Sequence, residues 1–270
     1  MIIAFDVGNT ETTVALFDGE QVRAHWRLTT SVPRTPDEYR LLLSNLLGGT
    51  GVSPSYVLGS AICSVVPPVT QLLQEVCAAA FGRQPVIVDA RSKLPIRLEV
   101  DEPFTVGADR VANTLAATIL YRRDTIIVDV GTATTYDVIT GDGSFIGGVI
   151  QPGVGSSAET LFRRTAQLAA TELIPPAHVI GTRTDECIRS GVLYGAVDSI
   201  DGIVARIVAE WGVADPLVIA TGGLAATLKP FCRSFHHVDP FLTLQGVRLA
   251  YEIIRAHSNT PDAMKVTGPA

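Results

Sequence analysis

The chain has 270 residues, of which 47% are hydrophobic and 18% are charged, and its formal net charge is −6. This size and composition are typical of a compact soluble protein with one large domain or two mid-sized ones. The net negative charge gives no electrostatic basis for binding nucleic acid or an anionic membrane. The sequence begins with a strand-like segment and contains no apolar run of about 18 residues or more, so we expect no membrane span and a cytoplasmic location.

The cysteines are scattered along the chain, without a CxxC pair or the spacing of zinc ligands. They are Cys63, Cys77, Cys187 and Cys232. We expect them to be small buried apolar residues in a reducing compartment.

Residues 2–19 and 126–143 share one pattern. Each segment has an apolar strand, the residues Asp-Val-Gly, a threonine-rich second strand and an Asp-Gly pair. Asp6 in the first copy corresponds to Asp129 in the second, and Gly8 corresponds to Gly131. Asp-Gly between two β-rich runs is a strong hairpin signal, so each copy predicts a β-hairpin and the repetition predicts two similar domains.

Further elements are expected after each hairpin. The first half predicts strands at 22–27, 56–63 and 85–88, and helices at 36–48, at 67–80 and from 107 onward. The second half predicts strands at 144–150 and 217–220, and helices at 154–168, 184–211, 223–229 and 242–256. This order predicts an α/β fold of mixed sheets with helices on both faces. We expect an N-terminal domain over 1–122, a C-terminal domain over 123–257 and a disordered tail over 258–270.

The first Asp-Val-Gly turn suits phosphate binding. Gly8 permits close approach of the backbone to a phosphate, and backbone N–H groups with nearby hydroxyls can surround anionic oxygens. The hydroxyls belong to Thr10, Thr12 and Thr13. Asp6 can orient a hydrated Mg²⁺, which prefers carboxylate and water oxygens. The aspartates could instead only hold their own turns, but their recurrence at matching positions favours the nucleotide interpretation.

Other phosphate-binding motifs are missing from the sequence. There is no GxxxxGK[ST] segment, and no GxGxxG follows a strand to open a helix. The pair Gly222-Gly223 lies where a predicted strand meets a predicted helix. It could approach the adenosine half of a nucleotide or form only a tight turn.

A candidate catalytic base lies in the segment Gly107-Ala-Asp-Arg110. The preceding Pro103 predicts extended chain there, so Asp109 is expected in a first helical turn, where the helix dipole favours the ionised carboxylate. Such a carboxylate can accept a hydroxyl proton during phosphoryl transfer, and Arg110 can hold an anionic substrate. The pair could also be an ordinary charge pair at a solvated helix start. Thr184 is predicted to be the N-cap of the long helix that follows it.

A set of short motifs appears in order along the chain. They are Asp6-Val-Gly-Asn-Thr10, Ser64-Val-Val-Pro-Pro68, Gly107-Ala-Asp-Arg110, Asp129-Val-Gly-Thr-Ala-Thr-Thr135, Gly147-Gly-Val-Ile-Gln-Pro-Gly153, Ser190-Gly-Val-Leu-Tyr-Gly195, Ala220-Thr-Gly-Gly-Leu-Ala225 and Val238-Asp-Pro-Phe-Leu-Thr-Leu244. Over residues 2–254 the set resembles the type III pantothenate kinases of the actin, sugar-kinase and Hsp70 superfamily.

The resemblance implies duplicated ribonuclease-H-like (actin-like ATPase) domains and a cytoplasmic homodimer. The implied reaction transfers the γ-phosphoryl group of ATP to pantothenate, giving 4′-phosphopantothenate in the first step of coenzyme A synthesis. The implied ATP contacts are Asp6, Val7, Gly8, Asn9, Thr10, Glu11, Thr12, Thr13 and Thr132. The implied pantothenate contacts are Val100, Gly107, Ala108, Asp109 and Arg110, with Thr184 from the partner subunit. The resemblance also makes Asp109 the proton acceptor, and it makes Asp129 the ligand of a monovalent cation, K⁺ or NH₄⁺.

One position departs from the family pattern. The family commonly has Tyr three residues before the proline of this segment, where this chain has Val100; Phe104 is an alternative aromatic wall. Loss of a buried tyrosine contact would weaken binding by about 1–3 kcal/mol. Two other interpretations stay open: another phosphotransferase or phosphohydrolase, and a non-catalytic nucleotide-binding regulatory relative.

Overall fold

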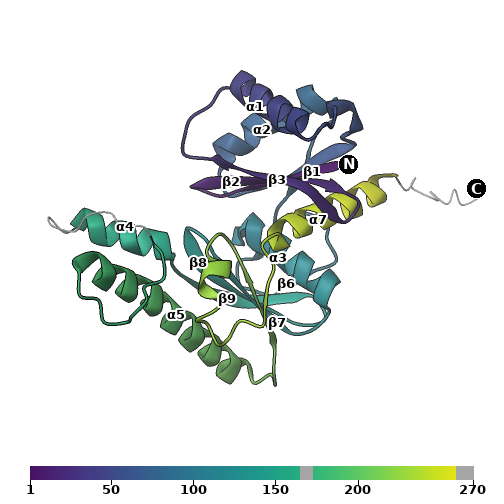
Figure 1. The fold of residues 1–270 in the computed structure, drawn as a ribbon. Coiled ribbons are helices and arrows are strands. Elements are labelled where there is room, and N and C mark those ends of the chain that lie inside the picture. The colour runs from purple at the N-terminus through teal and green to yellow at the C-terminus, as the bar shows by residue number, and fades with distance from the viewer. Residues whose placement is uncertain (165–172, 260–270) are drawn as a thin grey trace, which may run out of the picture. The chain divides into compact units, whose positions relative to one another are not determined.

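The computed structural model describes residues 1–164 and 173–259. The chain divides into two compact units, each with one β-sheet and its helices (Figure 1). Unit 1 comprises Met1–Pro95, Phe104–Leu115 and the chain from Leu244 onward, and unit 2 comprises Ile96–Pro103 and Ala116–Thr243. The units are thus interleaved in the sequence, whereas the pattern predicts one boundary after residue 122. The division into domains at 1–122 and 123–257 stays a prediction.

The sheet of unit 1 has the strand order β3-β2-β1-β4-β5. Its strands are β1 (Ile2–Val7), β2 (Glu11–Asp18), β3 (Gln21–Thr29), β4 (Gly59–Ser64) and β5 (Val86–Val88). The first three are antiparallel neighbours, and β4 and β5 continue the sheet in parallel with β1. The strand predicted at 56–63 begins later, because Pro54–Tyr56 form a 3₁₀ turn whose N-cap is Ser53.

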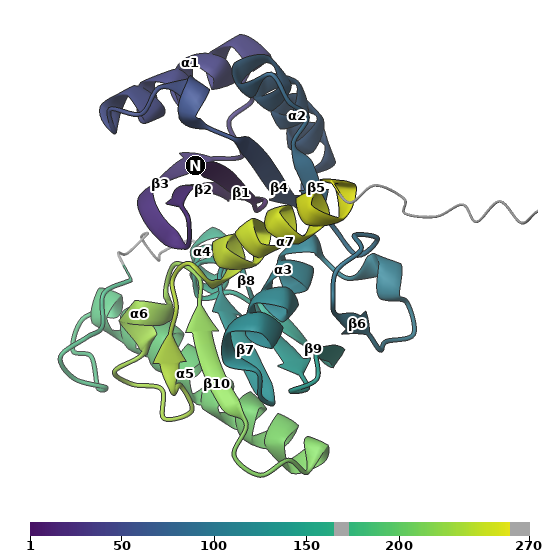
Figure 2. The same ribbon diagram turned by 90° about the vertical axis from the view of Figure 1, so that its right-hand side faces the viewer.

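Helices cover both faces of this sheet (Figure 2). Helices α1 (Pro36–Gly49) and α2 (Pro67–Phe81) share a buried core with the large aliphatic side chains of β1 and β2. Helix α7 (Leu242–Asn259) packs on the opposite face. There Arg248 lies over the Phe17 ring, and a Cβ on Gly59 would come 2.8 Å from the Tyr251 ring. These contacts explain why the C-terminal helix belongs to unit 1.

The sheet of unit 2 has the strand order β11-β10-β7-β8-β9-β6. Its strands are β6 (Arg97–Leu98), β7 (Thr125–Val130), β8 (Ala133–Ile139), β9 (Ser144–Pro152), β10 (Leu217–Thr221) and β11 (His237–Val238). The order β9-β8-β7-β10 repeats the order β3-β2-β1-β4 of unit 1, with the same antiparallel and parallel pairings. The predicted duplication is therefore confirmed as a repeat of structure, as is the mixed α/β class.

The main helix of unit 2 is α5 (Thr184–Trp211), whose apolar side packs on β7, β8 and β10. Helices α4 (Val154–Arg164) and α6 (Ala225–Leu228) complete the unit. Helix α3 (Ala108–Ala116) continues as a π-helical turn over Ala117–Tyr121. Residues 165–168 of a predicted helix and 260–270 of the predicted tail lie outside the described residues, and α7 extends to Asn259, past its predicted end.

The cysteines follow the prediction in part. Cys63, Cys77 and Cys232 are buried, whereas Cys187 is exposed on α5, so the expectation of burial was wrong for that residue. Burial raises the pKa of the Cys77 and Cys232 thiols to about 12. None of the helices in the described ranges is long and apolar enough to span a bilayer.

Candidate active site

The first Asp-Val-Gly turn joins β1 to β2 in unit 1. Asp6 is half-buried near the end of β1, and the N–H of Gly8 donates to the Glu11 carbonyl at 3.0 Å. A Cβ on Gly8 would lie 3.1 Å from that carbonyl, so the tight turn explains the glycine. Asn9, Thr10 and Glu11 are exposed at the tip. The turn therefore presents polar residues to solvent, where a phosphate could reach them.

Alternation along β2 separates the predicted threonine contacts. Thr12 is fully buried, and its hydroxyl lies 2.7 Å from that of Thr30. Thr13 is half-buried and points to the other face, since successive side chains of a strand alternate. In this structure Thr12 supports the turn from inside, and its hydroxyl has a protein partner.

The second turn, in unit 2, is one residue shorter than the first. β7 ends at Val130 and β8 begins at Ala133, and the Gly131 N–H donates to the Ala133 carbonyl at 3.0 Å. Asp129 is half-buried near the end of β7, and Thr132 is exposed at the tip. Asp129 thus occupies the place in unit 2 that Asp6 has in unit 1.

Glycines from distant segments meet around this second turn. The N–H of Gly153 donates to the Thr132 carbonyl at 3.1 Å, and the Ser156 hydroxyl donates to the same oxygen at 2.7 Å. Gly222 has φ +89, and a Cβ there would strike the Asp129 carboxylate and the backbone of Val130. Because β10 pairs with β7 in parallel, the predicted Gly222-Gly223 turn lies beside Asp129. The close packing leaves the Asp129 carboxylate bordered by backbone.

The predicted base lies at the start of α3, in the part that belongs to unit 1. Asp109 is in the first turn, as expected, and its Oδ1 accepts the N–H of Arg110 at 2.9 Å. A Cβ on Gly107 would collide with that carboxylate, which explains the glycine. Asp109 and Arg110 are both half-buried. The carboxylate is thus held over the N-terminus of its own helix.

Thr184 is the first residue of α5, and the predicted N-cap role was wrong. The N-cap is Arg183, which makes no side-chain capping bond. Glu186 reaches back instead, and its carboxylate accepts the Thr182 N–H at 2.9 Å. This bond holds the pKa of Glu186 below its ordinary value. Thr184 itself is exposed in the first turn of α5.

Thr184 lines a cavity of about 660 Å³ within unit 2. Its walls come from β8, the end of β9, α4 and α5, and they include Thr134, Gln151 and Cys187. Sequence reasoning missed this cavity because its walls come from segments far apart in the chain. Cys187 is exposed on α5 where that helix lines this cavity.

Val100 follows β6, a strand that the sequence pattern did not reveal. It is half-buried and lies in unit 2. Phe104 is in unit 1, where it is 62% exposed and the Arg91 guanidinium lies 5.2 Å from its ring centroid. The role of either side chain toward a substrate stays a prediction.

Metal ligands are sparse. Within residues 1–164 and 173–259, no group of three or more His, Cys, Asp or Glu side chains could hold a metal ion. A Mg²⁺ ion held mainly by substrate phosphates and water needs only one or two carboxylates from the protein, so the single carboxylate of Asp6 in unit 1 fits such an ion.

Comparison with known proteins gives the family. The profile of the type III pantothenate kinase family matches residues 2–206. The chain belongs to the type III pantothenate kinases. It is 43% identical over 256 residues to the type III pantothenate kinase of Roseiflexus sp. strain RS-1, and the alignment covers 95% of this chain and 100% of the relative. It is 39% identical over 252 residues to that of Moorella thermoacetica, with 93% and 99% covered.

Solved structures share the fold with this type III pantothenate kinase at low sequence identity. Component A of (R)-2-hydroxyglutaryl-CoA dehydratase from Acidaminococcus fermentans is similar with a TM-score of 0.56 and 11% identity, covering 95% of this chain and 98% of that one. The activator of 2-hydroxyisocaproyl-CoA dehydratase from Clostridium difficile, solved with ADPNP, has a TM-score of 0.50 and 12% identity, with 97% and 99% covered. The actin-like ATPase fold is thereby confirmed.

Proposed function

We propose that this chain is an ATP-dependent pantothenate kinase that forms 4′-phosphopantothenate and ADP. Membership of the type III family carries this proposal, and the two Asp-Val-Gly turns with Asp109 at a helix start supply the chemistry it needs. Phosphoryl transfer depends mainly on positioning and on neutralising the charge of the phosphates, so few side chains are required.

The turn after β1 is assigned to the phosphates of ATP. The backbone N–H groups at its tip would donate to phosphate oxygens, and the exposed side chains of Asn9 and Thr10 would add polar contacts. Asp6 would hold Mg²⁺ through water, and the ion would neutralise charge on the β- and γ-phosphates. Val7 is buried and would contribute only its backbone.

The turn after β7 is assigned to a monovalent cation and a further phosphate contact. Asp129 would supply the carboxylate for K⁺ or NH₄⁺, and Thr132 the phosphate contact. The fit rests on the backbone that borders Asp129, because the packing of Gly222 brings peptide groups close to the carboxylate. A single carboxylate with oxygen dipoles suits an ion of charge +1 better than a cluster of acids would.

The proton of the acceptor is assigned to Asp109. As the oxygen of the pantothenate hydroxyl forms its bond to the γ-phosphorus, the carboxylate takes the hydroxyl proton, and the bond to the departing ADP breaks. Arg110 would pair with the pantothenate carboxylate, and Gly107 and Ala108 would let the substrate approach the helix start. Val100 would form part of the pantothenate pocket.

We further propose that the enzyme is a cytoplasmic homodimer. Thr184 would then contact pantothenate bound by the partner subunit, which accounts for an exposed threonine beside a cavity. The free cysteines agree with a reducing compartment.

A comparison of acceptors tests the proposed reaction. ADP release with MgATP should require pantothenate, and it should stop when pantothenate is replaced by an analogue with hydrogen in place of the terminal hydroxyl. ADP release at the same rate without any acceptor would instead make the protein an ATP hydrolase.

A further inference from the structure

The edge of the unit 2 sheet carries a strand that has no counterpart in unit 1. β6 pairs in parallel with β9, whereas β3, which corresponds to β9, is an edge strand of its own sheet. The segment Ile96–Pro103 belongs to unit 2, although the chain on either side of it belongs to unit 1. This excursion carries Val100, the residue assigned to the pantothenate pocket.

The segment Ile96–Pro103 is joined to the unit 2 sheet by only a short stretch of backbone pairing. The N–H of Arg97 donates to the Gly143 carbonyl at 2.9 Å, and the N–H of Glu99 donates to the Phe145 carbonyl at 2.8 Å. Leu98 and Val100 are only half-buried, so apolar contacts hold the strand incompletely. A strand this short needs side-chain bonds to fix its register.

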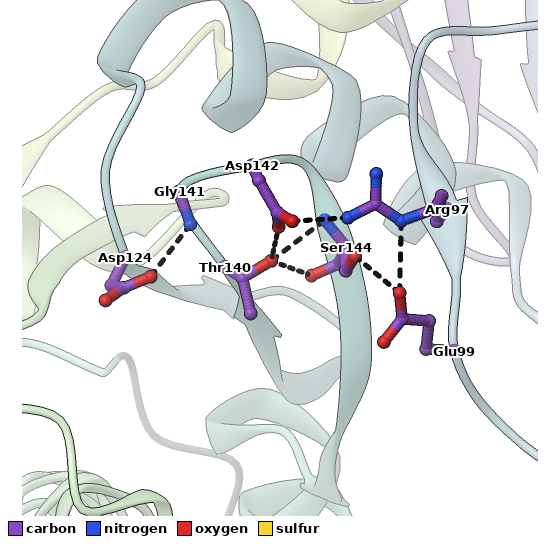
Figure 3. Close-up of polar contacts among 7 residues, drawn as sticks. All are labelled: Arg97, Glu99, Asp124, Thr140, Gly141, Asp142 and Ser144. Atoms are coloured by element: carbon purple, nitrogen blue, oxygen red, sulfur yellow. Dashed lines mark hydrogen bonds and ion pairs between the residues drawn. The ribbon is translucent and has the colours of Figure 1, made fainter.

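The exposed side chains of Arg97 and Glu99 supply those bonds (Figure 3). Arg97 donates through Nε to Oε1 of Glu99 at 3.1 Å and through Nη2 to Oδ2 of Asp142. The Ser144 hydroxyl donates to the same Glu99 oxygen at 2.8 Å. Glu99 is thus bound by Arg97 of β6 and by Ser144 of β9, and Arg97 also binds Asp142 in the turn before β9.

The turn that holds Asp142 is itself fixed. The Thr140 hydroxyl donates to Asp142, the Ser144 N–H donates to the Thr140 hydroxyl at 3.0 Å, and the Gly141 N–H donates to Asp124 at 2.8 Å (Figure 3). The hydroxyl of Thr140 and the guanidinium of Arg97 hold the pKa of Asp142 below its ordinary value. The hydroxyl of Ser144 and the same guanidinium lower the pKa of Glu99. The network is therefore charged at neutral pH.

We infer that Arg97, Glu99 and Asp142 are positioning residues for pantothenate: they fix the register of residues 97–100 on β9 and thereby the place of Val100. Arg97 and Glu99 are exposed on one face of the segment, and Leu98 and Val100 alternate with them. A slip of one residue would exchange the two faces and remove Val100 from its position. The inference rests on the proposed function.

Replacement of Arg97 tests this inference, and the first hairpin offers a matched control. Arg97→Ala should raise the KM for pantothenate by roughly three- to tenfold, as expected for loss of a charged surface network. Its kcat and its KM for ATP should stay within about twofold of the wild-type values. Arg97→Lys should recover part of the loss, because lysine keeps the charge but cannot bridge two carboxylates with a planar fork. The control is Arg23→Ala, which removes the ion pair to Asp18 (4.0 Å) at the corresponding Asp-Gly turn of unit 1 and should change neither KM.

Hydrogen exchange gives a readout that does not depend on catalysis. Peptides covering 96–103 should exchange faster in Arg97→Ala than in the wild type or in Arg23→Ala, because without the side-chain network the N–H groups of residues 97 and 99 separate more often from the Gly143 and Phe145 carbonyls. An active wild type with an unchanged pantothenate KM in Arg97→Ala would overturn this inference alone. So would unchanged exchange, or a fall in kcat without a rise in KM. A wild type inactive toward pantothenate would overturn the proposed function and this inference together.

Discussion

The hydroxyls of Thr12 and Thr30 lie 2.7 Å apart in the interior of unit 1, where each is the other's hydrogen-bonding partner. The Thr30 N–H also donates to the Thr10 carbonyl at 2.9 Å. Two hydrogen bonds therefore join the turn between β1 and β2 to Thr30, the residue that follows β3. This pairing favours a supporting role for Thr12 in the turn, and its predicted contact with ATP stays a prediction.

Thr12→Val should therefore affect stability more than ATP binding. It leaves the buried Thr30 hydroxyl without its partner, which should lower the free energy of unfolding by about 1–3 kcal/mol. The double variant Thr12→Val/Thr30→Val should recover part of that loss, since both polar groups are then removed. Urea unfolding and the KM for ATP check the two halves of the prediction. A large rise in that KM with unchanged stability would mean that Thr12 contacts the nucleotide directly.

Asp109→Asn should keep ATP binding and lower kcat by on the order of 100-fold or more, because the amide cannot accept the hydroxyl proton. Asp37→Asn is the matched control: Asp37 is likewise in the first turn of its helix, α1, but has no assigned role in the reaction. Steady-state ADP release measures both variants. Equal turnover by wild type and Asp109→Asn would remove Asp109 from the mechanism.

Asp129→Ala and Asp129→Asn should abolish activation by K⁺, since each removes the negative charge assigned to the cation. The rate should be measured against K⁺ concentration at constant ionic strength, with choline as the replacing ion. Circular dichroism separates loss of the site from loss of the fold. If the variants were activated over the same range of K⁺ concentration as the wild type, the cation would bind elsewhere.

Gly222→Ala should destabilise the protein and weaken the K⁺ response together. The residue has φ +89, and the added Cβ would lie 2.7 Å from the Val130 backbone and against Asp129. Overpacking of this kind typically costs about 1–3 kcal/mol. Gly223→Ala is the control, because a Cβ there meets no atom within 4 Å. Thermal unfolding compares the pair, and equal stability of the two variants would contradict the close packing beside Asp129.

The sequence pattern predicted the elements whose signals are local. Both Asp-Gly hairpins lie where the repeat placed them, and the helix expected over 184–211 is α5 with the same bounds. These elements have apolar runs, turn residues or helical periodicity that can be read without tertiary contacts.

The features that the pattern missed depend on partners far away in the chain. β6 is too short to show alternation and forms only because β9 offers a free edge. The closeness of Gly222 to Asp129 depends on the parallel pairing of β10 with β7. The predicted cap at Thr184 failed because Glu186 closes the helix start instead. In each case a tertiary or side-chain partner decided between local alternatives.

The most direct test of the account is the stoichiometry of the reaction with purified wild-type protein. Phosphorus NMR of MgATP, pantothenate and K⁺ should record ADP and 4′-phosphopantothenate appearing in equal amounts, and neither should form when pantothenate is left out. ADP that accumulates with inorganic phosphate and without phosphorylated pantothenate would contradict the assignment of this chain as a pantothenate kinase.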